Sequence, residues 1–321
     1  MDWIRVTIYT SPDGIEAVTG RLYRLGITGL EIEDEKDFKD FLENNKQYWD
    51  YVDEELLKEK HKETCVKAYV SDDVNGRELL LAIEGSMREL KASDENGEFG
   101  TLKVEADGIN TEDWANNWKQ YFHPMEVGEK LLIKPMWEDL DKPTDRLVFN
   151  INPGMSFGTG SHYTTQLCIE AIEKYIKPGD KMLDLGCGSG ILSIISLMLG
   201  ASEAVAVDID PNAADTAYEN ADMNDIDKSH YKVLTGNVVT DPDIQEEISK
   251  NRYEVVAANI VADVIIGLAP KAREYMKEGG VFITSGIISD REEDVKNALS
   301  ENGFEIVSVQ RRKDWVSIVC R

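Results

Sequence analysis

The first hundred residues combine short runs that alternate apolar and polar positions with longer runs at helical spacing. Residues 3–10, WIRVTIYT, alternate like a strand, whereas residues 14–26 repeat apolar positions three and four apart and stop at a glycine. The same criteria predict strands over 28–34, 64–70 and 101–109 and a helix over 76–92. This β-α-β-β-α-β order predicts a smaller α+β ferredoxin-like domain at residues 1–108. A charged stretch over about 34–59 is an insertion in it.

A different pattern occupies residues 109–145, which we predict to form a linker helix and a connecting segment. Trp114, Trp118, Phe122 and His123 recur there at roughly helical spacing. They form either the apolar face of a helix packed on a neighbour or the wall of a pocket between domains. His123 precedes a proline, and no nucleophile is paired with it in the sequence.

From about residue 147 onward, strand-like apolar runs alternate with amphipathic helical runs. Repeated βα units of this kind predict a parallel sheet with helices on both faces. We therefore predict an α/β, Rossmann-like domain of seven strands over residues 146–321, ending in two strands joined by a turn near Lys313. Ligands of such sheets bind at the carboxyl ends of the strands.

A glycine-rich loop follows the strand at 181–186 and begins the helix at 190–200. A dinucleotide fingerprint, G-x-G-x-x-G, would place its third glycine at residue 191, which is an isoleucine here. The glycines are instead Gly186, Gly188 and Gly190, after the acid Asp184. This D-x-G-x-G-x-G spacing resembles the first motif of class I S-adenosylmethionine-dependent methyltransferases. In that family the amino acid tail of the cofactor lies against the glycine backbone.

Acidic and amide side chains follow the next strands. Asp208 ends the strand at 204–210 and is placed to accept hydrogen bonds from two ribose hydroxyls. Asp210 precedes Pro211 and is interpreted as a helix cap. Asn237 follows the third strand of the domain, where it either meets an adenine or only stabilises a turn.

Asn259 lies at the carboxyl end of the fourth strand, and its amide offers one acceptor and one donor group. An attacking amine must be neutral, and the acceptor oxygen can hold its hydrogens and orient its lone pair. The position resembles the first residue of the N-P-P-Y motif of amino-group methyltransferases, but Ile260 and its neighbours replace the aromatic that stacks on a planar base. This favours an aliphatic amine as the methyl acceptor. No general base is evident nearby in the sequence.

The stretch before the domain, NPGMSFGTGSHYTTQLCIEAI, is the most distinctive part of the chain. Gly158 and Gly160 predict a tight loop, and Thr164 and Thr165 fall in the first turn of the helix that follows. Hydroxyls and free N–H groups at a helix start can bind a carboxylate or close over a ligand. His162 is either a base or an ordinary loop residue, and the second role is favoured.

Several of these motifs together resemble the PrmA-type ribosomal protein methyltransferases. They are FGTGSHYTTQLCIEAI, LDLGCGSGILSI, VDIDPNAADTAYENADMN and ANIVADVIIGLAP, in the family's order, with WKQYFHPMEVGEKLLIKPMWE and DWVSIVC also similar. The resemblance implies a catalytic domain that uses S-adenosyl-L-methionine and an N-terminal ferredoxin-like domain that recognises the substrate. It implies methylation of the eleventh protein of the large ribosomal subunit, at its N-terminal amine and at lysines.

Carried over by position, the family's cofactor contacts fall on Thr165, Gly186, Asp208 and Asn259, with Gly188 in the same glycine loop. Asn259 is also the predicted catalytic residue. The chain departs from the family at Ser156, where alanine is usual, and at Ser161 and Tyr163, where threonine and proline are usual. Ser161 keeps a hydroxyl, whereas Tyr163 removes a rigid residue from the loop.

Composition and charge limit the classes of partner that the chain is expected to bind. The chain has 321 residues, of which 42% are hydrophobic and 30% charged, with a formal net charge of −26. This acidity either only aids solubility or also repels a nucleic acid backbone and attracts a basic protein. Together with the resemblance, it leads us to expect a basic ribosomal protein as substrate and no direct nucleic-acid binding. The four cysteines are far apart, which fits reduced thiols in the cytoplasm and opposes a zinc site. No run approaches the roughly 18 apolar residues of a membrane helix, and we expect no membrane contact.

Three other functions are compatible with parts of the sequence. A class I methyltransferase acting on a small molecule or on RNA would keep the fold and change the substrate. An NAD-linked oxidoreductase is opposed by the glycine spacing. A non-catalytic binding module is opposed by the intact loop, acid and asparagine.

Overall fold

The protein is represented by a computed structural model. It describes residues 3–27, 29–34, 64–72, 74–94, 96–107, 123–140, 142–152 and 160–321. Residues 1–121 and 122–321 form two compact units. The predicted insertion beyond Asp34, the side chains of Trp114, Trp118 and Phe122, and Ser156 and Gly158 lie outside the described residues.

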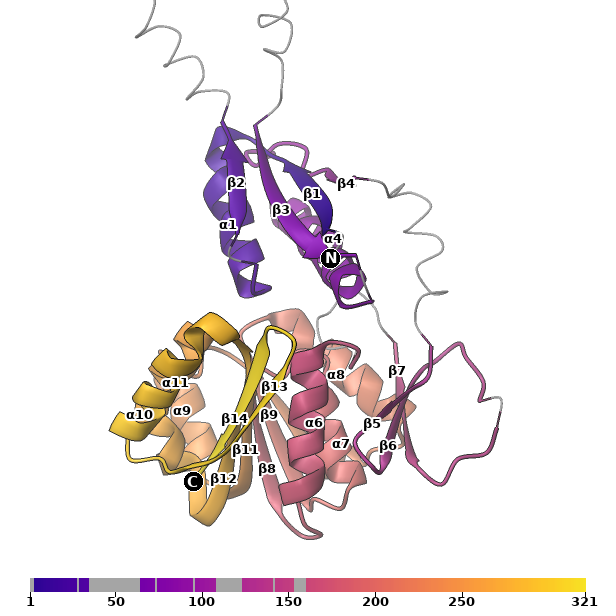
Figure 1. Cartoon of the computed structure of the whole chain (residues 1–321), viewed down its shortest axis with the longest axis vertical. Helices are drawn as coiled ribbons and strands as arrows, with labels where there is room; N and C mark the ends of the chain where they lie inside the picture. The colour runs from indigo at the N-terminus through magenta and orange to yellow at the C-terminus, as the bar shows by residue number, and fades with distance from the viewer. Residues whose placement is uncertain are drawn as a thin grey trace, which may run out of the picture. The chain divides into compact units, whose positions relative to one another are not determined.

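The first unit has the predicted order of strands and helices (Figure 1). The elements are β1 Trp3–Tyr9, α1 Ile15–Arg24, β2 Leu30–Glu33, β3 Cys65–Ser71, α4 Val74–Ser93 and β4 Val104–Ala106, with a 3-10 turn at Pro12–Gly14. The sheet order is β2-β3-β1-β4 and every pair is antiparallel. Alternate residues of β1, such as Val6 and Ile8, are fully buried, and α1 and α4 contact each other and β3. This is the topology of the ferredoxin-like sandwich.

The second unit is built on a seven-stranded sheet in the order β10-β9-β8-β11-β12-β14-β13. The first five strands of this series run parallel. β14 runs antiparallel to them, and β13, which is antiparallel to β14, returns to their direction at the end of the sheet. The bounds are β8 Lys181–Leu185, β9 Glu203–Asp208, β10 Tyr231–Thr235, β11 Tyr253–Asn259, β12 Met276–Ile288, β13 Ile306–Arg312 and β14 Trp315–Cys320. The predicted Rossmann-like α/β class is confirmed, and Lys313 lies in the final turn with a positive φ of 52°.

Helices cover both faces of this sheet, as repeated βα units require (Figure 1). Side chains of neighbouring residues such as Met182 and Leu183 enter two different cores because a strand alternates its faces. One core holds α6 Tyr163–Tyr175, α7 Ile191–Met198 and α8 Pro211–Met223. The other holds α9 Pro242–Ser249, α10 Ala262–Tyr275 and α11 Glu292–Glu301. Short 3-10 turns lie at Lys228–His230 and Ser289–Arg291.

A small third sheet differs from the sequence prediction. Strands β5 Met125–Val127, β6 Leu131–Pro135 and β7 Leu147–Ile151 pair in that order, and β5 and β6 fall in the stretch predicted to be a linker. They belong to the second unit, where Leu131 and Phe149 are fully buried in the same core as α6. Burial of these apolar residues against the same core explains why the segment forms strands.

In the described parts of the chain, no helix has both the length and the apolar composition that are needed to cross a membrane.

Candidate functional site

Three predicted residues lie in one row at the carboxyl edge of the parallel sheet. Strands β9, β8 and β11 are neighbours, with Leu185 paired to Val207 and Asp184 paired to Ala257. One residue further along β8 and β9 are Gly186 and Asp208, and two residues beyond Ala257 is Asn259. The register therefore brings these three residues side by side.

The loop at 186–190 has a backbone that side chains would disturb. Gly186, Gly188 and Gly190 have φ values of 80°, 50° and 77°, which favour glycine strongly. A Cβ on Gly186 would collide with the Ile260 side chain, and one on Gly190 would lie 2.5 Å from the Tyr231 hydroxyl. The loop is tied to β9 because the N–H groups of Gly186 and Cys187 donate to the Val207 carbonyl, at 2.8 and 3.1 Å.

Residue 191 supports the distinction from a dinucleotide loop. Ile191 is the first residue of α7 and is only 2% exposed. A dinucleotide fingerprint needs glycine there so that helix and strand can approach closely. The buried isoleucine fills that space instead.

Asp208 closes one end of the row. Its Oδ2 accepts a hydrogen bond from the Gly188 N–H at 2.8 Å, and its Oδ1 accepts one from the Asp210 N–H at 2.9 Å. Burial raises the pKa of this carboxyl, and the backbone hydrogen bonds oppose the rise. Each carboxylate oxygen can accept further donors, so Asp208 can take hydroxyl groups while it holds the loop.

The neighbouring acid and amide have local roles. Asp210 is the N-cap of α8 and accepts from the Asn212 N–H at 2.9 Å, with Pro211 at the first helical position, as predicted. The Asn237 side chain accepts from the N–H groups of Val239 and Thr240, at 2.9 and 3.2 Å. Asn237 therefore stabilises the turn after β10, and its contact with an adenine stays a prediction.

Asn259 has one half of its amide engaged, and the other half has no partner among the described residues. Its Nδ2 donates to Thr165 Oγ1 at 3.3 Å, and Thr165 is fully buried in the first turn of α6. Its Oδ1 is buried, and no residue in the described part of the chain donates a hydrogen bond to it. Buried polar atoms without a partner are rare and costly, so this oxygen marks a place where a donor from a ligand can bind.

The start of α6 closes over the same region. His162 is the N-cap, and its Nδ1 lies 2.7 Å from Thr164 Oγ1 and accepts from the Thr164 N–H at 3.3 Å. Its ring also contacts the Trp315 ring edge-on, with centroids 4.9 Å apart. His162 thus has the structural place that the sequence favoured. Trp315 is not among the predicted site residues, and only its position in the terminal DWVSIVC motif could have indicated this contact.

A second acid lies beneath the loop. Asp184 is fully buried, and its Oδ2 accepts from the N–H and hydroxyl of Ser193 at 3.1 and 2.5 Å. Its Oδ1 has no partner among the residues that the structure describes. Burial raises its pKa from 3.8 to about 6, against the Ser193 hydrogen bonds. The folded protein therefore binds a proton at this site more readily than the unfolded chain does.

This raised pKa predicts a pH-dependent effect of Asp184→Asn. Ionisation above about pH 6 destabilises the folded state, and the penalty disappears as the pH falls from about 6 toward 3.8. Thermal unfolding between pH 5 and 8 should show the midpoint difference, variant minus wild type, rising by several degrees with pH, since each pKa unit is worth about 1.4 kcal/mol. The control is Asp222→Asn, at a carboxylate that is 62% exposed. Parallel curves for Asp184→Asn and wild type would contradict the prediction.

The comparisons with known proteins agree over almost the whole chain. The profile of the family described as "Ribosomal protein L11 methyltransferase (PrmA)" matches residues 2–321. Proteins named ribosomal protein L11 methyltransferase from Clostridium perfringens, strains SM101 and 13, are each 37% identical over 319 residues, covering 99% of this chain and 98% of theirs.

Among solved structures, one is described as a ribosomal protein L11 methylase from Lactobacillus delbrueckii subsp. bulgaricus. It is 31% identical, has a TM-score of 0.56, and is matched over 62% of this chain and 98% of its own. With a family profile that spans the chain and relatives above 30% identity, the resemblance seen in the motifs is confirmed. The chain belongs to the PrmA family of ribosomal protein L11 methyltransferases.

Proposed function

We propose that the protein transfers methyl groups from S-adenosylmethionine to amino groups of ribosomal protein L11, its N-terminal amine and lysines among them. The observation that carries this proposal is the row formed by the glycine loop, Asp208 and Asn259, in a chain of the PrmA family. S-adenosylmethionine supplies, when bound, a methyl group on an electrophilic sulfonium. The alternative substrates, a small molecule or RNA, are not favoured by the relatives.

The residues present fit this cofactor. The open backbone at Gly186 and Gly188 lets an amino acid tail approach without meeting a Cβ. Asp208 holds the loop through the Gly188 N–H and retains acceptor capacity for ribose hydroxyls. Thr165, buried beside Asn259, completes the set of cofactor contacts that we propose.

Asn259 is the proposed catalytic residue because its side chain is already oriented. Thr165 Oγ1 accepts from Nδ2, which leaves the buried Oδ1 to accept an N–H from the substrate amine. A neutral amine held in this way directs its lone pair away from the amide. Positioning of this kind can contribute roughly 7–11 kcal/mol to a bimolecular transfer, so the site does not depend on a strong base.

The charge and the first unit support a basic protein substrate. The net charge of −26 attracts basic surfaces and opposes nucleic acid. We assign substrate recognition to the ferredoxin-like unit, predicted at residues 1–108, and catalysis to the domain predicted at 146–321, with β5 and β6 attached to it. A cytoplasmic location follows from a ribosomal substrate.

The test is incubation of the purified protein with recombinant ribosomal protein L11 and S-adenosylmethionine, followed by intact-mass and peptide mass spectrometry. We expect mass increases of whole methyl groups on amino groups of the protein. Incubation with ribosomal RNA should leave the RNA unmodified, and calorimetric titration with NAD should show no binding. Methylation of the RNA alone would reject the assigned substrate. So would an L11 protein that stays unmodified although the purified protein binds S-adenosylmethionine saturably.

A further inference from the structure

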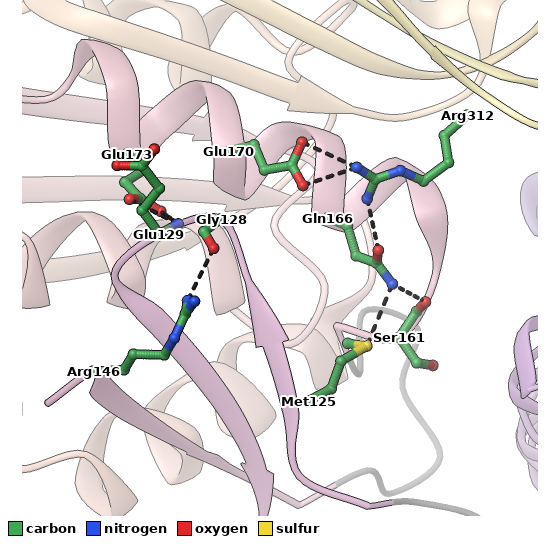
Figure 2. Close-up of polar contacts among 9 residues, drawn as sticks. All are labelled: Met125, Gly128, Glu129, Arg146, Ser161, Gln166, Glu170, Glu173 and Arg312. Carbon is green, nitrogen blue, oxygen red and sulfur yellow. Dashed lines mark hydrogen bonds and ion pairs between the residues drawn. The ribbon is translucent and has the colours of Figure 1, made fainter. Parts of the chain in front are cut away.

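The last hairpin of the sheet is connected to the start of α6 through Arg312, the final residue of β13. Its NH1 donates to Gln166 Oε1 at 2.8 Å, and its NH2 donates to both carboxylate oxygens of Glu170, at 2.9 and 3.2 Å. Figure 2 shows the guanidinium lying between these two α6 side chains. The three side chains are partly buried, and Arg312 is 34% exposed.

Gln166 connects Arg312 to the loop that precedes α6. Its Nε2 donates to the Ser161 carbonyl at 2.7 Å and lies 3.5 Å from Met125 Sδ, as Figure 2 shows. Arginine can only donate, so it fixes the Gln166 carbonyl toward itself and the amide NH2 toward Ser161. Arg312 thereby sets which way the Gln166 amide points.

The loop held by Gln166 lies against the first residue of α7, the helix that follows the glycine loop. Gly160 has a φ of 89°, and a Cβ there would come within 3.0 Å of the Ile191 side chain, the first residue of α7. Thr165, next to Gln166 in the chain, accepts the hydrogen bond of Asn259. Residues 160–165 are therefore in contact both with the helix that begins at the glycine loop and with the proposed catalytic amide.

A second contact from the same hairpin reaches the same loop. The Lys313 ammonium lies 4.8 Å from the centre of the Tyr163 ring, within the range of a cation–π interaction. Two adjacent residues of the hairpin, Arg312 and Lys313, therefore both contact side chains in the first turns of α6.

We propose that Arg312 is a positioning residue for methyl transfer. It acts through Gln166 to hold residues 160–162 against the start of α7, and so maintains the shape of the cofactor site. The inference rests on the proposed function. The inference gives this role to Arg312 and not to Arg311, its neighbour on β13. The Arg311 guanidinium donates to both carboxylate oxygens of Glu292, at 2.7 and 2.5 Å.

The experiment compares three variants of the full chain by calorimetric titration with S-adenosylmethionine, steady-state kinetics and thermal unfolding. Arg312→Met removes the donors to Gln166 and Glu170. The Gln166 amide can then turn away from the Ser161 carbonyl, and loss of that one hydrogen bond to the loop should weaken cofactor binding about tenfold. Gln166→Glu keeps an acceptor for Arg312 but cannot donate to the Ser161 carbonyl. Arg311→Met is the matched control and should bind the cofactor as wild type does.

Gln166→Glu distinguishes positioning from simple anchoring of the hairpin. If Arg312 positions the loop, Gln166→Glu raises the Kd and KM for the cofactor as much as Arg312→Met does, while the unfolding midpoint and the KM for L11 stay near wild type. If Arg312 only anchors the hairpin, Gln166→Glu binds the cofactor normally, which overturns the inference even if Arg312→Met folds poorly. If the wild-type protein does not bind S-adenosylmethionine, the proposed function and this inference are both rejected.

Discussion

Asn259→Ala is expected to reduce kcat for methylation of ribosomal protein L11 by about 10²–10³-fold, a range typical for loss of a group that orients a reactant. The reason lies in the two ends of the amide. Nδ2 is held by Thr165 Oγ1 at 3.3 Å, and Oδ1 is buried without a partner. Alanine removes the acceptor that orients the amine, whereas the glycine loop and Asp208 remain. Because Asn259 is only one of several predicted cofactor contacts, the cofactor Kd, measured by calorimetry, should change much less than kcat.

Two further variants make this result specific. Asn237→Ala removes an amide of the same kind from the turn after β10. The Asn237 side chain accepts from the backbone N–H groups of Val239 and Thr240, so this variant should retain kcat. Thr165→Val removes the hydroxyl that holds Nδ2, so the amide can rotate and kcat should fall about tenfold, the cost of one lost hydrogen bond. Full activity in Asn259→Ala would eliminate the orienting role.

Much of the fold could be predicted because local periodicity and burial coincide. In the first unit the alternation in residues 3–10 is the pattern of a strand with one buried face, and Val6 and Ile8 are indeed fully buried. In the second unit the runs ending at Asp208 and Asn259 are buried on both faces, as parallel strands covered by helices must be.

The parts that could not be predicted depend on contacts between distant residues. Strands β5 and β6 have three and five residues, too short for a clear period, and they form because β7 and α6 bury them. Both oxygens of Glu173 accept from the Glu129 N–H, which ties the small sheet to α6 across 44 positions (Figure 2). The link from Arg312 to Gln166 spans 146 positions. No local signal in the sequence reports such pairs.

The same distinction applies to the candidate site. Gly186 could be identified because its motif is contiguous, and Asp208 and Asn259 because each ends a strand in a repeating series. The turn hydrogen bonds of Asn237 needed coordinates, since a turn asparagine and a ligand-binding asparagine have the same place in the sequence. Likewise, the Ile260 side chain that occupies the space beside Gly186 is visible only once β8 and β11 are adjacent.

Asp208→Ala is expected to weaken S-adenosylmethionine binding by about 100-fold, which we attribute to the loss of two charge-assisted hydrogen bonds to the ribose, partly replaced by water. The substitution also removes the acceptor of the Gly188 N–H at 2.8 Å, so the glycine loop loses one of its ties to β9. Calorimetric titration measures the Kd directly. Asp208→Asn keeps one carbonyl acceptor and should lie between wild type and Asp208→Ala.

Asp210→Ala is the matched control for this prediction, since it removes a carboxylate only two residues away. Asp210 Oδ1 accepts from the Asn212 N–H and caps α8, so its loss should cost about 1 kcal/mol of stability and leave the cofactor Kd within about twofold. Opposite responses of the two neighbours would assign ribose binding to Asp208 alone. If Asp208→Ala bound the cofactor as tightly as Asp210→Ala, the acid at the end of β9 would have only a structural role, and the row of three residues would no longer define the site.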